Sequence, residues 1–180
     1  MKKYLLYLSC IVAIIFLVGC SMDNTPTKKV ENFLNSYKNL DSDVTSQMED
    51  IINKDTTMTD EGKEKYRDIL KKQYQDMTYT IKDETIDGDN ATVTVEIEVY
   101  DLSKVNTASD KYYEEHPDEF KDSEGNIVDS LFVDYRIKQL EKAEDRVKYT
   151  IDFGLTKINN EWTINTLDNS TIQKLHGLYA

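Results

Sequence analysis

Residues Ala91–Tyr100 read ATVTVEIEVY, a nearly unbroken alternation of apolar and polar side chains. Successive side chains of a strand point to opposite faces of its sheet. The odd-numbered positions would therefore be buried, and the even-numbered ones would be exposed to solvent. The residues before this stretch, Asp87-Gly88-Asp89-Asn90, are typical of a tight turn, and residues 78–86 supply a partner strand. The sequence therefore predicts a β-hairpin with one buried face.

A second hairpin is predicted near the C-terminus. Residues 147–155 alternate in the same way, Asn159-Asn160 suits a tight turn, and Trp162 begins the returning strand. Apolar residues at helical spacing precede the first hairpin and fill residues 103–145 between the two. We therefore expect one α+β domain over residues 26–180, in which N-terminal helices pack on a curved antiparallel sheet and a helical insertion separates the hairpins.

The N-terminus has the layout of a secretory signal. Lys2 and Lys3 are followed by residues 4–18, an uncharged and mostly apolar run. A spanning helix needs about 20 apolar residues, whereas the apolar region of a signal peptide has about 7–15. The run ends in Leu17-Val18-Gly19-Cys20, which resembles the lipobox of bacterial lipoproteins.

This resemblance implies a processed and acylated protein. Residues 1–19 would be removed, Cys20 would carry a diacylglyceryl group and palmitate, and residues 20–25 would form a short tether at the outer face of the cell membrane. Two acyl chains give stable anchoring where one is marginal. Because Cys10 and Cys20 are the only cysteines, no free thiol or disulfide would remain. The alternative is an ordinary signal peptide with a chance cysteine.

Composition limits the partners. The chain has 22 Lys and Arg against 34 Asp and Glu, a formal net charge of −12. Nucleic-acid binding needs clustered cations, so we expect no nucleic-acid partner. The oligomeric state is not predicted.

Four aromatic residues form the candidate ligand pocket: Tyr79, Tyr149, Phe153 and Trp162. They fall on the predicted buried faces of strands, where rings with polar atoms could line an apolar site. Plain core packing is the alternative for each of them.

Other chemistry-bearing residues have simpler explanations. His116 and His176 would lie at a charged turn and near the last helix, with no nucleophile nearby in sequence. The acidic residues of the first hairpin, including Glu84 and Glu96, would cover a solvated face. We therefore predict no catalytic residue, no metal site and no cofactor.

A family resemblance covers nearly the whole mature chain. Residues 26–30, residues 82–89 with the strand beyond them, and Leu175-His176-Gly177 resemble small uncharacterised lipoproteins of low-GC Gram-positive bacteria. The layout is also similar to the nuclear-transport-factor-2-like fold, which implies a cone-shaped domain with a pocket. Residues 103–145 depart from that pattern.

The leading hypothesis is a lipid-anchored binding or interaction module outside the cytoplasm, without catalysis of its own. It would hold a small ligand or an envelope protein. Two alternatives remain open: a small hydrolase or isomerase that uses the same cavity, and a passive structural or surface lipoprotein. The first alternative requires a titratable group of shifted pKa in the pocket, and the second requires a filled domain.

Overall fold

The computed structural model describes residues 24–180, so the predicted signal peptide and Leu17, Val18, Gly19 and Cys20 lie outside the described residues. The α+β class is confirmed. In chain order the elements are α1 (Pro26–Lys38), α2 (Ser42–Lys54), α3 (Asp60–Gln75), β1 (Thr78–Asp87), β2 (Asn90–Tyr100), α4 (Leu102–Glu115), the 3-10 helix η1 (Pro117–Phe120), α5 (Asp129–Leu140), β3 (Arg146–Ile158), β4 (Glu161–Ile164) and α6 (Asn169–Leu175). The predicted helical insertion between the hairpins is confirmed as α4, η1 and α5.

The sheet has the order β1-β2-β3-β4, with every neighbouring pair antiparallel. The inward positions of β2 are 0–5% exposed, as its alternation predicts. Asn159 and Asn160 join β3 to β4 with φ angles of 51° and 67°, the left-handed values of a type I′ hairpin turn. Both predicted hairpins are therefore present.

Helix α1 covers the buried face of the sheet. Val30 and Leu34 are fully buried against it, and the ring centroid of Phe33 lies 5.8 Å from that of Phe153 on β3. Thr25 fixes the start of the helix, because its hydroxyl accepts a hydrogen bond from Lys28 N at 3.1 Å. The cone-shaped pocket implied by the fold resemblance is not confirmed, since α1 occupies this face.

A bulge in β1 changes the role of one acidic residue. The register shifts between Ile81 and Asp83, which places Glu84 opposite Val93 of the buried face. The Glu84 carboxylate accepts hydrogen bonds from Thr27 N at 2.8 Å and Thr27 Oγ1 at 2.6 Å, in the first turn of α1. Glu84 is exposed, as expected, but the bulge turns its carboxylate toward the positive end of a helix, a contact that the sequence did not predict.

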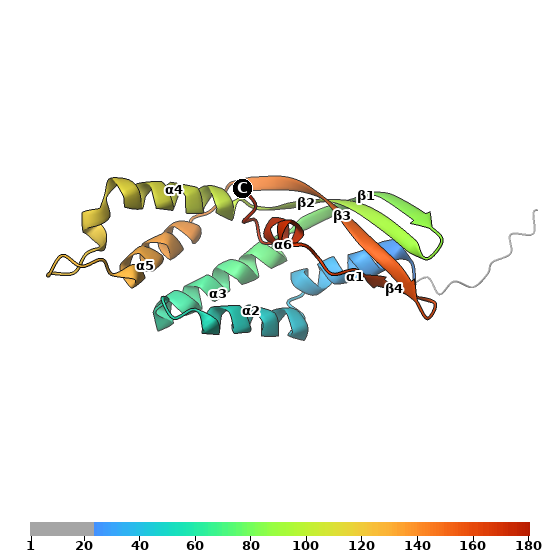
Figure 1. Cartoon of the computed structure of the whole chain (residues 1–180), viewed down its shortest axis with the longest axis horizontal. Coiled ribbons are helices and arrows are strands. Elements are labelled where there is room, and N and C mark those ends of the chain that lie inside the picture. The colour runs from blue at the N-terminus through green and yellow to red at the C-terminus, as the bar shows by residue number, and fades with distance from the viewer. Residues whose placement is uncertain (1–23) are drawn as a thin grey trace, which may run out of the picture.

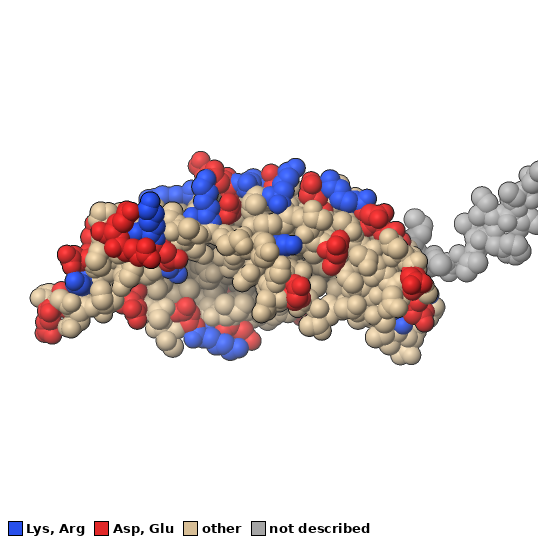
Figure 2. All heavy atoms as spheres, turned by 45° about the horizontal axis from the view of Figure 1, so that its top comes forward, with Lys and Arg blue, Asp and Glu red and all other residues tan. Residues whose placement is uncertain are grey.

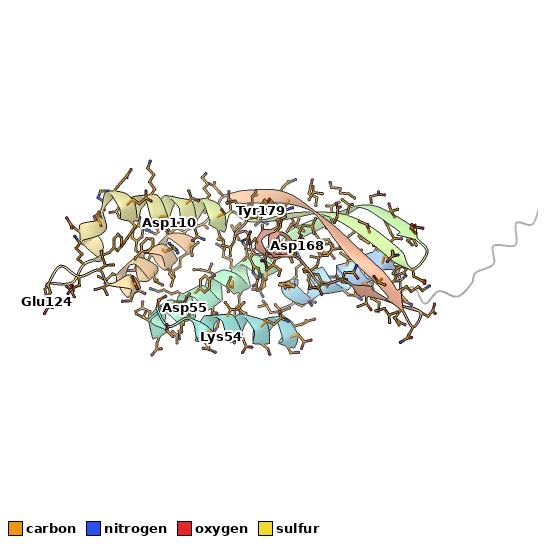
Figure 3. The ribbon with its side chains drawn as sticks, in the orientation of Figure 1. Lys54, Asp55, Asp110, Glu124, Asp168 and Tyr179 are labelled. Carbon is orange, nitrogen blue, oxygen red and sulfur yellow. The ribbon has the colours of Figure 1, made fainter. Side chains whose placement is uncertain are left out.

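The molecule is elongated (Figure 1). The described chain begins at one end, beside the β1–β2 and β3–β4 turns, and α4, η1 and α5 form the other end. Glu124 marks the outermost turn of that end (Figure 3). We call α3, α4, η1 and α5 the helical lobe. Within residues 24–180, no helix combines the length and apolar composition needed to cross a membrane.

Gln73 of α3 joins the helical lobe to the sheet. Its side chain is 1% exposed, its amide nitrogen donates to Tyr100 O at 3.2 Å, and its amide oxygen accepts from Tyr100 N at 3.0 Å. Gly177, with φ +68°, ends α6 beside the same backbone, where a Cβ would overlap Tyr100 O. This close approach directs Leu178 into the helical lobe.

Candidate functional site

The four aromatic residues predicted to line a pocket share one face of the sheet without forming a common cavity wall. Phe153 is fully buried and Trp162 is 7% exposed, and both belong to the core under α1. Tyr79 and Tyr149 lie opposite the same β2 residue, Ile97, from its two sides. The grouping of all four as ligand contacts stays a prediction.

The hydroxyl groups of Tyr79 and Tyr149 are both hydrogen-bonded within the protein. Tyr79 Oη donates to Asn35 Oδ1 of α1 at 3.0 Å, and Tyr149 Oη donates to the carbonyl oxygen of Tyr179 at 2.8 Å. Burial raises the pKa of both phenols, so they stay protonated at neutral pH. Their hydroxyl donors are therefore already used within the protein.

Tyr149 borders an open groove of about 610 Å³ between α4 and β3. Lys104 and Lys111 come from α4, and the C-terminal residues Tyr179 and Ala180 close one side. Tyr179 lies where α4 meets β3 (Figure 3). The groove brings one predicted residue together with several that the sequence did not single out.

A second and more enclosed cavity of about 270 Å³ lies inside the helical lobe. Apolar side chains supply much of its wall: Met58, Leu102, Val133, Ile137, Leu140 and Leu178. They come from the α2–α3 loop, α4, α5 and the segment after α6. An apolar cavity with a few polar groups is the usual form of a small-molecule site.

Two of its residues hold buried polar atoms without a hydrogen-bond partner among the described residues: Asn106 Oδ1 and Arg136 Nε. Arg136 is otherwise well held, since it forms an ion pair with Asp110 and stacks at 4.5 Å over the ring of Phe132. Buried polar atoms nearly always find a partner in native proteins, and an unsatisfied one costs free energy. Both atoms are covered by protein, so their unmet hydrogen bonds belong to the packing behind the cavity wall.

Tyr66, Asp55 and Thr57 complete the polar part of the cavity. Burial raises the pKa of Tyr66, and the Asp55 carboxylate raises it further, so the phenol stays neutral. Asp55 accepts hydrogen bonds from Thr57 N at 2.7 Å, Thr57 Oγ1 at 2.6 Å and Met58 N at 3.1 Å. These bonds lower the pKa of Asp55 and hold the loop that closes the cavity.

The two histidines lie elsewhere. His116 is exposed at the far end of the molecule, with its ring 4.4 Å from that of Tyr112. His176 is hydrogen-bonded through Nδ1 to Tyr74 Oη at 2.8 Å, and burial lowers the pKa of this histidine. Neither lines the groove or the cavity. Within residues 24–180, no three metal-type side chains come together.

Charge is distributed unevenly over the surface. Figure 2 shows acidic and basic side chains mixed along the upper edge, a dense acidic group at the end of the molecule with α4, and a hollowed, mostly uncharged area in the middle. The acidic end agrees with the net negative charge of the chain.

The sequence signal for the enclosed cavity lies in polar residues of two helices, and the aromatic residues of the strands do not carry it. Asn106 follows Leu102 by four positions, and Arg136 stands between Val133 and Ile137 on α5. Polar residues that interrupt an apolar helical stripe are candidates for buried polar contacts. The periodicity could mark both residues, but only the folded chain brings them to one cavity.

No family model matches the chain, and no curated protein matches it. A solved structure of the Bacillus subtilis protein ycdA, provisionally described as a lipoprotein, is similar at 14% sequence identity with a TM-score of 0.42. The match covers 86% of this chain and 47% of that protein, so this chain spans about half its length. A likeness at this level carries no argument about function.

Proposed function

We propose that this chain is a lipid-anchored binding module outside the cytoplasm. Its anchor is Cys20, and its ligand site is the enclosed cavity of the helical lobe. The anchor rests on the basic start, the short apolar run and the Leu17-Val18-Gly19-Cys20 sequence. The binding function rests on the cavity.

The observation that carries the binding function is a space of about 270 Å³ whose wall combines apolar side chains with the polar residues Asp55, Asn106 and Arg136. A purely structural domain gains stability by filling such a space. A binding site keeps it, because the ligand supplies the missing contacts. This supports a binding role over a passive structural one.

The position of the chain start supports the same arrangement. The Asn24 side chain donates to Asn160 O at 2.8 Å and accepts from Trp162 N at 3.2 Å, at the β3–β4 turn. Only residues 21–23 separate Asn24 from Cys20, a distance of at most about 14 Å. An acylated Cys20 would hold the turn end of the sheet near the membrane, with the helical lobe pointing away (Figure 1).

The anchor is tested by metabolic labelling with radioactive palmitate and mass spectrometry of the mature N-terminus. Cys20→Ala should abolish labelling and leave the precursor uncut. The matched control is Cys10→Ala, which should keep both labelling and processing because Cys10 lies in the removed segment. Labelling that persists in Cys20→Ala would refute the anchor.

The binding function is tested by native mass spectrometry of the mature protein purified from membranes. A copurified small molecule should be present in the wild type and in Ala108→Phe, which changes the open groove and leaves the enclosed cavity unchanged. It should be absent in Val133→Phe, which fills the enclosed cavity. Retention in Val133→Phe with loss in Ala108→Phe would move the site to the surface around Ala108, which includes the groove beside Tyr149.

A further inference from the structure

The end of the molecule that carries both hairpin turns has exposed apolar side chains. We call residues 86–90 and 157–161 the sheet tip. Ile86 ends the apolar part of β1 and is 52% exposed, and Ile158 precedes the β3–β4 turn and is 54% exposed. The two turns lie side by side, because Asp89 O accepts a backbone hydrogen bond of 2.7 Å from the β3 segment.

The two isoleucines belong to opposite faces of the sheet. Ile86 lies opposite Ala91, whose side chain is on the buried face. Ile158 follows the buried Leu155 by three positions, and the alternation of a strand places its side chain on the other face. A protein seated on one face of the sheet would cover one of them, whereas a surface that meets the tip end-on covers both.

The start of the described chain is fixed to the same tip. The Asn24 side chain donates to Asn160 O at 2.8 Å, and the chain start lies beside both turns (Figure 1). Residues 21–23 separate Asn24 from Cys20, a span of at most about 14 Å. Acyl chains on Cys20 would therefore keep a bilayer within that distance of the sheet tip.

Charge limits how deeply the tip can enter a bilayer. The tip carries Asp87, Asp89 and Glu161 against Lys157, and Lys29 of α1 pairs with Glu161 at 3.2 Å. Ionised carboxylates stay in water or among headgroups, whereas apolar side chains gain free energy at the boundary between headgroups and acyl chains. The arrangement suits a shallow contact with uncharged or zwitterionic lipid.

We propose that the sheet tip is a membrane contact in which Ile86 and Ile158 enter the boundary between lipid headgroups and acyl chains. The acylated protein then stands on its sheet end, with the helical lobe held away from the bilayer. This inference rests on the proposed anchor at Cys20 and adds to it a second contact, made by the folded domain itself.

Trp162 can report this contact. It is the only tryptophan of the chain, and it lies opposite Lys157 in the β3–β4 ladder, directly after the tip. The mature acylated protein is placed in phosphatidylcholine nanodiscs, one molecule in each, with and without brominated acyl chains, which quench tryptophan fluorescence at short range. Brominated nanodiscs should quench Trp162 in the wild type. A single molecule in each disc leaves no second copy to cover the tip.

A double variant tests the two side chains. Ile86→Thr with Ile158→Thr should lower the equilibrium constant of tip contact about tenfold, with a matching loss of quenching, because two half-exposed apolar groups become polar. Threonine is β-branched and keeps the strand preference. Ile51→Thr is the matched control, because Ile51 is 58% exposed on α2, and it should keep wild-type quenching. Urea midpoints check that each variant is folded.

The outcomes separate the anchor from the tip. A mature protein that carries no acyl chain by mass spectrometry would overturn both. An acylated protein whose Trp162 is not quenched, or whose quenching survives in the double variant, would overturn the tip contact and leave the anchor intact. Slower hydrogen exchange at the tip that requires two molecules in one disc, without quenching, would assign the two isoleucines to a second copy of the chain.

Discussion

In the sheet half, the five inward residues of β2 are 0–5% exposed and belong to one hydrophobic core that α1 covers. In the helical lobe, Phe120 is buried among rings that are themselves half-exposed, and a cavity of about 270 Å³ remains between the helices. Strand register fixes each inward residue opposite a partner, whereas helices can pack with space between them. We infer that the sheet supplies stability and the lobe supplies the binding site.

The largest expected effect is in the sheet core. Phe153→Ala should lower the free energy of unfolding by about 3–5 kcal/mol, because its fully buried ring leaves a cavity against Phe33. Urea unfolding followed by Trp162 fluorescence measures this loss. A loss below about 1 kcal/mol would mean that Phe153 borders a space that can refill, as its predicted pocket role requires.

Loss of the corresponding buried ring in the helical lobe, that of Phe120, should lower the free energy of unfolding by less. Phe120→Ala removes a 3% exposed ring from between α4 and α5, but its neighbours can close over the gap, so about 3 kcal/mol is expected. Hydrogen exchange should show faster exchange in α4 and α5 and unchanged protection in β2 and β3. Equal loss of protection in the sheet would show that the two halves unfold as one.

The contact between Gln73 and Tyr100, which joins the two halves, should have a smaller effect than either core change. Gln73→Leu leaves the N–H and C=O of Tyr100 without their partners, which should cost about 1–3 kcal/mol in urea unfolding. Gln75→Leu is the matched control, because Gln75 is exposed on the same helix and should change stability by less than about 0.5 kcal/mol. Equal effects would remove the assigned role of Gln73.

The smallest effect is a pH dependence that arises at His176, which is hydrogen-bonded to Tyr74 of α3. Burial lowers the pKa of His176 below its ordinary 6.5, so the unfolded chain binds the proton more readily. The contribution of His176 is fully present above pH 6.5 and should be lost as pH falls below that value. The wild type should therefore be less stable at pH 5.5 than at pH 7.5.

His176→Gln should flatten this dependence. The carboxylates of lowered pKa, such as Asp55, lose their contribution only as the pH falls below about 5, so they act below this window. Urea midpoints of the two proteins at both pH values make the comparison. An unchanged slope in His176→Gln would assign the dependence to other groups.

Local pattern was sufficient for most of the fold. Alternation over Ala91–Tyr100, the Asn159-Asn160 turn and helical spacing in residues 103–145 each act within a few residues, and each predicted its element. The candidate site was less accessible to this reasoning. Tyr149 was singled out and borders the groove, but Asn106 and Arg136 were not, because their meeting depends on how α4 and α5 pack.

The amino-acid sequence alone determined the two hairpins, the insertion and the chemical character of the N-terminus, since each depends on side-chain type and short-range spacing. The tertiary structure alone decided that α1 fills the face of the sheet, that a bulge turns Glu84 onto α1, and that a cavity remains in the helical lobe. These features arise from contacts between residues far apart in the chain, and short-range periodicity does not predict such contacts.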